Sequence, residues 1–411
     1  MKTTKTILLL MISLGARAAL ADEPAAATSD PRALVEQAAI ASEDPDALKA
    51  RRGEIEGLLR KALEQDPKLL EARLDLTLLF FHTGDMATAK TELDKLLQLD
   101  PNHASGRALR GMMLARDGQV AEARAEFDAA VAADPYNPIA NAELSALAYK
   151  AGNDEEAIRL ARLALLIDSA NVNAYVTIAM AYRHMGNANL SKLVCYNALS
   201  MSPKAAPIYN ILGLLFLAED QVKDAIVQFE KAVGFDPDFM EAHANLGAVM
   251  LNYGDFAGAL EHFDAVLRLQ PGNIDALLSR AVALRGLGKY PEAGEGYEKV
   301  LAAKPGHLGA LYNRCILYQE YLNEYEKALD YCREMLRSID KKHPDYKEMT
   351  DRVSGIEETI KVMKQMKDQA PPPETTAPGA AEAPAAATTG DAPAAAAPSD
   401  ATQAPSADGA H

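Results

Sequence analysis

Three grids of residues run through the chain at one spacing of 34 residues. Proline recurs on the first grid, with one gap at Ser169: Pro67, Pro101, Pro135, Pro203, Pro237, Pro271 and Pro305. Glycine recurs on the second grid, with one gap at Asp220: Gly84, Gly118, Gly152, Gly186, Gly254 and Gly288. Alanine recurs on the third grid, with one substitute at Ser191: Ala89, Ala123, Ala157, Ala225, Ala259 and Ala293. Independent grids with a common period predict an array of one repeated supersecondary unit.

Each grid has a physical reason in a chain of paired helices. Proline cannot continue a helix, so its grid marks the boundary between successive pairs. Glycine tolerates the left-handed backbone that ends the first helix of a pair in a tight turn. Alanine is needed where the second helix crosses the first, because a larger side chain would push the two backbones apart. Apolar residues recur at helical spacing around the grids. Two successive repeats show this: Leu212, Gly213, Phe216, Ala225, Phe229 and Ala232, then Leu246, Gly247, Met250, Ala259, Phe263 and Val266.

The period and these signature positions make the chain resemble the tetratricopeptide-repeat family. The usual tryptophan of that family is absent, and Tyr175, Tyr209 and His243 stand at its position. Since 49% of the residues are hydrophobic but only 6% are aromatic, the composition favours close helix packing over a sheet sandwich. The resemblance implies an all-α protein, a right-handed α-solenoid whose first helices line the concave side.

We expect eight repeats over residues 70–342, flanked by less regular segments. The eighth, 308–342, carries one extra residue near Asn323, because Ala328 stands one position late. Residues 36–69 are predicted to form a divergent N-terminal repeat with a clear second helix from Glu54 to Gln65. Residues 343–368 are predicted to form a capping helix, because a terminal unit must cover the last exposed core face. Its apolar stripe comprises Tyr346, Met349, Val353, Ile356, Ile360 and Met363.

Both ends of the chain are typical of segments outside the folded array. Residues 1–21 have the features of a signal peptide, since Lys2 and Lys5 precede a short apolar run and small residues follow at the cleavage positions. Residues 22–35 are expected to be flexible. Residues 369–411 are expected to be disordered, because they contain no Lys, Arg or aromatic residue and cannot bury a core. We therefore expect an exported protein of the periplasm, either free or peripheral to the outer or inner membrane.

The charge balance narrows the class of partner. The formal net charge is −16 and becomes −19 once a signal peptide with three basic residues is removed. An acidic chain repels phosphate backbones and anionic lipid surfaces, so nucleic acid is not an expected partner. Beyond the signal peptide no stretch has the roughly 18 apolar residues of a membrane helix, so we expect no direct membrane span. Other proteins are the expected partners, and the oligomeric state is left open.

The sequence lacks the motifs of common enzymes. It has neither a His-Glu-x-x-His pair nor a Gly-x-Ser-x-Gly elbow. Gly286 and Gly288 resemble the start of a nucleotide loop, but Pro291 replaces the third glycine. We therefore expect no enzymatic activity, no cofactor and no bound metal. His243 and His262 share one repeat, and we interpret them as packed side chains rather than as metal ligands.

The three cysteines have different predicted roles. Cys195 stands at the aromatic position of a second helix and is expected to be a small core residue. Cys315 and Cys332 fall on the two helices of the eighth repeat at inward positions, and export would permit a disulfide between them. The alternative is a pair of buried thiols.

The resemblance implies a binding trough along the concave side. By family position its lining residues are Leu74, Leu78, Phe81, Met112, Tyr149, Val176, Met180, Arg183, Asn210, Leu214, Leu217, Leu251, Val282 and Tyr312. Members that bind chaperone tails carry paired Lys and Asn there, whereas Asn245 and Asn313 lack matching basic residues. An apolar trough rimmed by acid favours an amphipathic helix or an extended apolar segment with basic flanks. The alternative is that neighbouring repeats or the C-terminal helix cover these residues.

Three classes of function compete. We favour a non-catalytic scaffold of a bacterial envelope complex for motility, secretion, pilus assembly or polysaccharide export. The chain is similar in style to exported repeat proteins of myxobacterial gliding machinery and of pilus or polymer-export systems. The second class is a periplasmic chaperone or assembly factor for apolar clients. The third, an enzyme regulated by its repeats, would need a catalytic domain for which the repeats leave no room.

Overall fold

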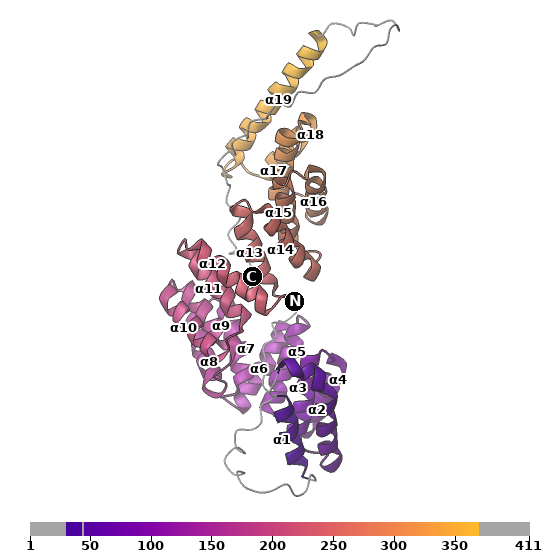
Figure 1. Ribbon diagram of the computed structural model, residues 1–411, viewed down its shortest axis with the longest axis vertical. Coiled ribbons are helices and arrows are strands. Elements are labelled where there is room, and N and C mark those ends of the chain that lie inside the picture. Colours follow the sequence, from indigo (N-terminus) through magenta and orange to yellow (C-terminus); the bar gives the residue numbers. More distant parts are fainter. Residues whose placement is uncertain (1–29, 43–44, 370–411) are drawn as a thin grey trace, which may run out of the picture. The chain divides into compact units, whose positions relative to one another are not determined.

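The computed structural model describes residues 30–42 and 45–369, which contain nineteen α-helices, one π-helix and no β-strand. These helices form two compact units, one ending at Phe239 and one beginning at Met240. The predicted signal peptide, most of the segment 22–35 and the tail beyond Gln369 lie outside the described residues. Helices adjacent in sequence pack as antiparallel pairs within each unit, which confirms the all-α solenoid class (Figure 1).

The first unit contains six helix pairs. In chain order they are α1 (Pro31–Ala41) with α2 (Pro45–Gln65), α3 (Leu70–Thr83) with α4 (Met86–Leu99), α5 (Ala104–Arg116) with α6 (Val120–Ala133), α7 (Pro138–Lys150) with α8 (Asp154–Ile167), α9 (Val172–His184) with α10 (Ala188–Met201), and α11 (Ala206–Ala218) with α12 (Val222–Phe235). The first helix of a pair also contacts the first helix of the next pair, as α5, α7, α9 and α11 do in succession. These first helices therefore form a continuous row.

The second unit contains three pairs and a terminal helix. They are α13 (Met240–Asn252) with α14 (Phe256–Leu269), α15 (Ile274–Gly286) with α16 (Tyr290–Ala303), α17 (Leu308–Ile316) and η1 (Leu317–Tyr321) with α18 (Tyr325–Ser338), and α19 (Tyr346–Gln369). Helix α19 packs on α18 through Met349, Val353 and Ile356, all buried. Ile360 also packs against this cluster, whereas Met363 is 51% exposed, so the apolar stripe of the predicted capping helix is uncovered at its last residue. No helix among the described residues has the length and apolar content needed to cross a membrane.

The glycine grid has the left-handed backbone that the sequence predicts. All six of its glycines have φ between 75° and 85°. Asp220, which fills the gap in the grid, has φ 60°. Asn323 has φ 57° and takes the same place in the eighth repeat, one residue late. Asp and Asn are the non-glycine residues that most readily adopt this conformation, so the turn is kept without glycine.

The alanine grid lies in the core between paired helices. Every member, with Ser191, is at most 1% exposed. Ser191 retains the small volume and donates a hydrogen bond from Oγ to the carbonyl of Ala179 at 2.7 Å. The first helices are equally tight, because a Cβ added at Gly213 would lie 2.5 Å from the ring of Phe229. Close helix crossings thus explain both residue preferences.

In several repeats the residue at the tryptophan position of the family makes a side-chain hydrogen bond. The side chain at that position reaches the carbonyl of the grid proline six residues earlier. Arg73 does so at 2.7 Å, Arg107 at 2.8 Å, Asn141 at 3.0 Å and Tyr209 at 2.9 Å. The contact satisfies a carbonyl in the turn between repeats, which a purely apolar side chain could not do.

The N-terminal boundary differs from the sequence prediction. Helix α1 begins at Pro31, inside the segment 22–35 that we expected to be flexible, and it forms the first helix missing from the divergent repeat. Asp30 accepts a hydrogen bond from the backbone N–H of Arg32 at 3.1 Å, and Pro31 occupies the first helical position. Both are strong signals for a helix start, since proline lacks only an N–H that has no helical partner there. Helix α2 begins at Pro45, well before Glu54.

The extra residue of the eighth repeat is absorbed by a π-helical turn. The insertion lies at Leu317–Tyr321, at the end of the first helix and just before Asn323, near which the sequence predicts it. A π-turn adds one residue to a helix without breaking its hydrogen-bond ladder. This keeps Ala328 at its crossing, where it is fully buried.

Candidate functional site

The predicted trough residues are divided between the two units. Leu251, Val282 and Tyr312 belong to the second unit, and the other eleven belong to the first. Twelve of the fourteen are partly exposed. The other two, Leu78 and Asn210, are buried, at 3% and 8% exposure. Helix α11 packs against both α9 and α12, which leaves Asn210 little free surface.

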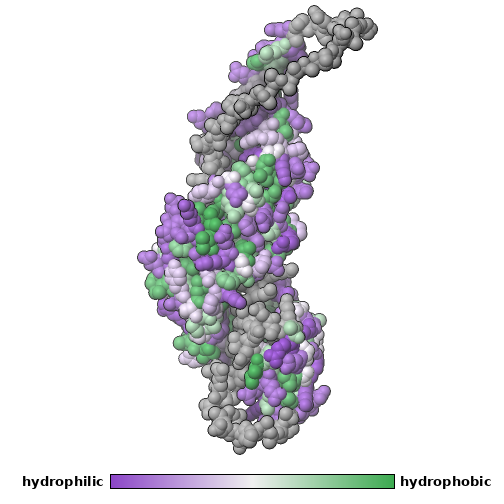
Figure 2. Space-filling model, in the orientation of Figure 1, coloured by the Kyte–Doolittle hydropathy of each residue, from purple (hydrophilic) through white to green (hydrophobic). Residues whose placement is uncertain are grey.

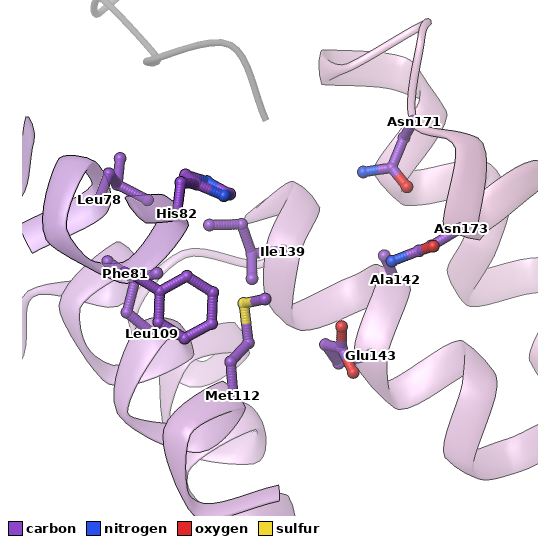
Figure 3. Close-up of a pocket in the computed structure, with 10 residues that line it drawn as sticks. All are labelled: Leu78, Phe81, His82, Leu109, Met112, Ile139, Ala142, Glu143, Asn171 and Asn173. Atoms are coloured by element: carbon purple, nitrogen blue, oxygen red, sulfur yellow. The ribbon is translucent and has the colours of Figure 1, made fainter. Parts of the chain in front are cut away.

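One hollow in the first unit gathers side chains from four successive first helices. It is lined by Leu78, Phe81 and His82 of α3, Leu109 and Met112 of α5, Ile139, Ala142 and Glu143 of α7, and Asn171 and Asn173 at the start of α9. Leu78 packs in the core and still contributes to this wall. Figure 3 shows Phe81, Met112 and Ile139 on one side, with Glu143 and Asn173 on the other.

The sequence prediction contained three of these ten residues, Leu78, Phe81 and Met112. The others were missed because family positions indicate which helix faces are concave but not which side chains converge across neighbouring helices. A sequence signal existed for Glu143. It stands 34 residues after Leu109 and 68 residues after Asp75, at a repeat position that is polar in most repeats of this chain.

Two ionisable groups give the hollow its polar character. Burial raises the pKa of Glu143, and Lys150 opposes that shift. Burial lowers the pKa of His82, so its ring is neutral near pH 7. His82 Nε2 is buried and has no hydrogen-bond partner among the described residues. Asn171, in contrast, is engaged as the N-cap of α9, where it accepts from the N–H of Ala174 at 3.0 Å.

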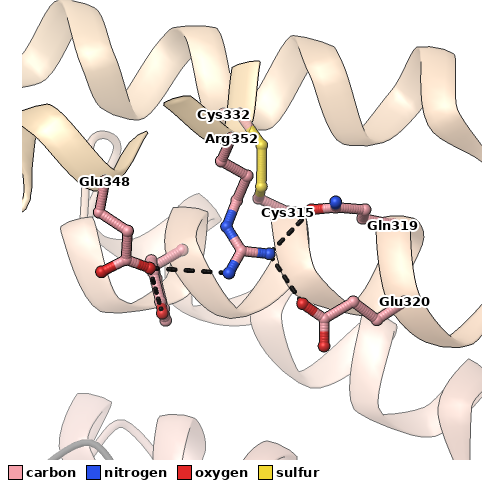
Figure 4. The surroundings of a disulfide bond; sticks show 7 residues. Cys315, Gln319, Glu320, Cys332, Glu348 and Arg352 are labelled. Carbon is pink, nitrogen blue, oxygen red and sulfur yellow. Dashed lines mark hydrogen bonds and ion pairs between the residues drawn. A yellow bond between two sulfur atoms is a disulfide. The ribbon is translucent and has the colours of Figure 1, made fainter. Parts of the chain in front are cut away.

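The second unit covers part of its own trough. Tyr312 donates a hydrogen bond to Glu348 of α19 at 3.1 Å, and the guanidinium of Arg352 lies 5.9 Å from its ring. Arg352 also reaches Gln319 and Glu320, both at 2.8 Å (Figure 4). The predicted partner residue Tyr312 is therefore held by the terminal helix, which is the alternative that the sequence left open.

Cys315 and Cys332 are joined by a disulfide in the structure, beside the Arg352 cluster (Figure 4). Their Cα atoms are 5.3 Å apart, within the usual range for such a bond. The bond links α17 to α18 in the repeat that contains the π-turn. Cys195 is a free, fully buried thiol, and burial raises its pKa to about 12. It behaves as a small core residue rather than as a nucleophile.

His243 and His262 pack against each other, with their Nδ1 atoms 3.0 Å apart. The two positions are 19 residues apart, as are Arg73 and Glu92 in another repeat, which form an ion pair at 3.2 Å. Burial, and then the charge of His243, lowers the pKa of His262. In the part of the chain that the structure describes, no group of three or more His, Cys, Asp or Glu could hold a metal ion.

Apolar surface also occurs away from the row of first helices. Figure 2 shows it over the part of the first unit formed by α8–α12. The exposed large apolar side chains of the second helices there are Leu166, Ile167, Leu190, Leu193, Tyr196, Met201, Val227 and Phe235. Exposed apolar side chains that gather on one region of a surface are candidates for protein contacts.

Family models of the tetratricopeptide repeat match most of the array. One matches residues 83–138, 109–173 and 249–307, and a second matches residues 172–204 and 206–239. Together they cover more than half of the chain. The protein therefore belongs to the tetratricopeptide-repeat superfamily, a class of stacked helical hairpins with extended binding surfaces. A comparison with curated proteins found no match.

One solved structure supports the fold, and two others align less closely. The crystal structure of the APC/C hetero-tetramer Cut9-Hcn1 aligns with a TM-score of 0.58 at 18% identity, over 70% of this chain and 55% of that chain. A structure of pilF from Pseudomonas aeruginosa aligns with a TM-score of 0.46 at 22% identity, over 52% of this chain and 96% of that chain. YrrB, described as a tetratricopeptide-repeat protein with an unusual peptide-binding site, aligns with a TM-score of 0.35 at 24% identity, over 46% of this chain and 96% of that chain.

Proposed function

We propose that this protein is a non-catalytic scaffold that binds a segment of a partner protein along the first helices of its first unit. The observation that carries the proposal is the hollow between α3, α5, α7 and α9. There, partly exposed apolar side chains lie beside a carboxylate on a surface built by successive repeats. Mixed apolar and charged concave surfaces of stacked repeats suit the recognition of peptide segments. The apolar surface over α8–α12 offers room for a second contact, as a scaffold requires.

We further propose that the protein works in the envelope of a Gram-negative bacterium, as a component of a motility, secretion, pilus or polysaccharide-export complex. The predicted signal peptide supports export. The bond between Cys315 and Cys332 supports an oxidising compartment, because thiols are kept reduced in the cytosol. Cell fractionation with N-terminal sequencing of the mature chain tests this, and we expect the periplasmic fraction and a start at Asp22. A chain that keeps its first residues and remains in the cytosol would refute it.

Crosslinking in the native cell tests the binding role. We expect Met112→Glu combined with Leu214→Glu to remove the crosslinked partner, because both side chains are partly exposed on first helices. A matched control, Glu155→Gln, changes an exposed residue of α8 and should leave the crosslink intact. Circular dichroism should show unchanged helix content in all variants. One dominant partner supports a scaffold, whereas many unrelated clients would point to a chaperone.

A further inference from the structure

The carboxylate in the hollow differs from other buried or partly buried glutamates of the first unit. Glu92 is paired with Arg73 and Lys95, at 3.2 and 2.8 Å. Glu126 is likewise paired with two arginines. Glu143 makes no ion pair or hydrogen bond with any described residue, although it sits in the wall of the hollow. The charge of Lys150 acts on Glu143 without forming an ion pair with it, and a partly desolvated carboxylate is costly unless a cation contacts it directly.

The opposite wall of the hollow is suited to an apolar group. Phe81 and Met112 are partly exposed there, Ile139 lies beside Met112, and Glu143 lies across from them (Figure 3). The ring of His82 points toward the same space, and its buried Nε2 has no hydrogen-bond partner among the described residues. Because burial keeps this ring neutral, it does not repel a cation placed nearby.

We propose that this hollow recognises a partner segment in which an apolar side chain is followed by a lysine or arginine. The apolar side chain packs against Phe81 and Met112, and the cation lies against the carboxylate of Glu143. This inference rests on the proposed binding role of the row of first helices and names the chemistry of the partner. The net charge of −16 adds long-range attraction for a basic segment.

Charge also distinguishes between the possible occupants. Residues 370–411 of this chain contain no lysine or arginine and cannot supply the cation. A free metal ion or a small amine would leave the apolar wall uncovered. A segment of another protein satisfies both walls at once.

Synthetic peptides test the proposal on the full-length protein. The probes are labelled peptides with a Gly-Ser frame around a central Leu-Lys, Leu-Gln, Leu-Glu or Ser-Lys pair, and binding is read by fluorescence anisotropy. We expect the Leu-Lys peptide to bind about tenfold more tightly than Leu-Glu, as one charge-assisted contact allows. Leu-Gln should fall between the two, and Ser-Lys should bind weakly because it lacks the apolar group.

Protein variants then assign the selectivity. Glu143→Gln should reduce the preference for Leu-Lys over Leu-Glu to about twofold, while Glu155→Gln should preserve it. Met112→Asp should weaken the binding of Leu-Lys and Leu-Gln alike.

Equal binding of Leu-Lys and Leu-Glu to the unaltered protein would overturn the inference without any variant, so misfolding cannot obscure the result. Binding that is equal for both peptides but lost in Met112→Asp would leave the proposed scaffold role standing. No binding of any peptide refutes the inference, and the crosslinking experiment then decides the scaffold role separately.

Discussion

Asp75 is a carboxyl group inside the first unit, and replacing it should stabilise the fold. It lies on α3 and is only 2% exposed. Burial, followed by the nearby charge of Glu71, raises its pKa from 3.8 to about 8. The folded protein therefore keeps this carboxyl protonated at pH 5 to 7, whereas the unfolded chain ionises it. Stability from this group is fully present below about pH 4 and is lost as the pH rises towards 8.

The size of the effect follows from the two pKa values. Each pH unit between them costs the folded state about 1.4 kcal/mol, because one proton is bound in the folded form and none in the unfolded form. From pH 5 to pH 7 the loss is about 2.7 kcal/mol, or roughly a hundredfold in the opening equilibrium of α3. Asp75→Asn has nearly the same shape but cannot ionise, so it escapes this loss.

Hydrogen exchange of the α3 backbone amides measures this directly. Wild type and Asp75→Asn are compared at pH 5, 6 and 7, and the comparison at one pH cancels the chemical exchange rate. We expect the variant-to-wild-type ratio of protection factors to rise about tenfold per pH unit. Asp94→Asn on α4 changes an exposed carboxylate and serves as the control with a flat ratio. A flat ratio for Asp75→Asn as well would show that the buried carboxyl does not hold its proton.

Two further predictions concern packing and the disulfide. Gly213→Ala should destabilise the first unit by about 1–3 kcal/mol in urea unfolding, because its methyl group would meet the ring of Phe229. Gly234→Ala has open space around the added methyl group and should stabilise the unit by about 0.5–1 kcal/mol. Equal effects of the two substitutions would contradict the packing argument. Alkylation of the denatured protein without reductant should modify one of the three thiols, as read by mass spectrometry, because Cys315 and Cys332 are bonded. Three modified thiols would show that the bond is absent. Prior reduction should lower stability by about 3 kcal/mol, as expected for a loop of 17 residues.

The sequence alone determined the architecture, because each grid follows from a local rule. Proline ends helices, a left-handed turn selects glycine, and a close crossing selects alanine. These rules act within one hairpin, so they can be read without knowing what lies next to it. They hold even at the exceptions, since Asp220 and Asn323 adopt the same left-handed backbone as the glycines they replace.

Only the tertiary structure decided which concave positions stay open. Family position placed Asn210 and Tyr312 in the trough, yet the first is buried and the second is held by α19. The sequence likewise does not predict that Glu143 and His82 line one hollow, because this depends on the offset between successive first helices. The exposure of a side chain depends on helices from other repeats. The sequence pattern of one repeat does not predict how closely those helices approach.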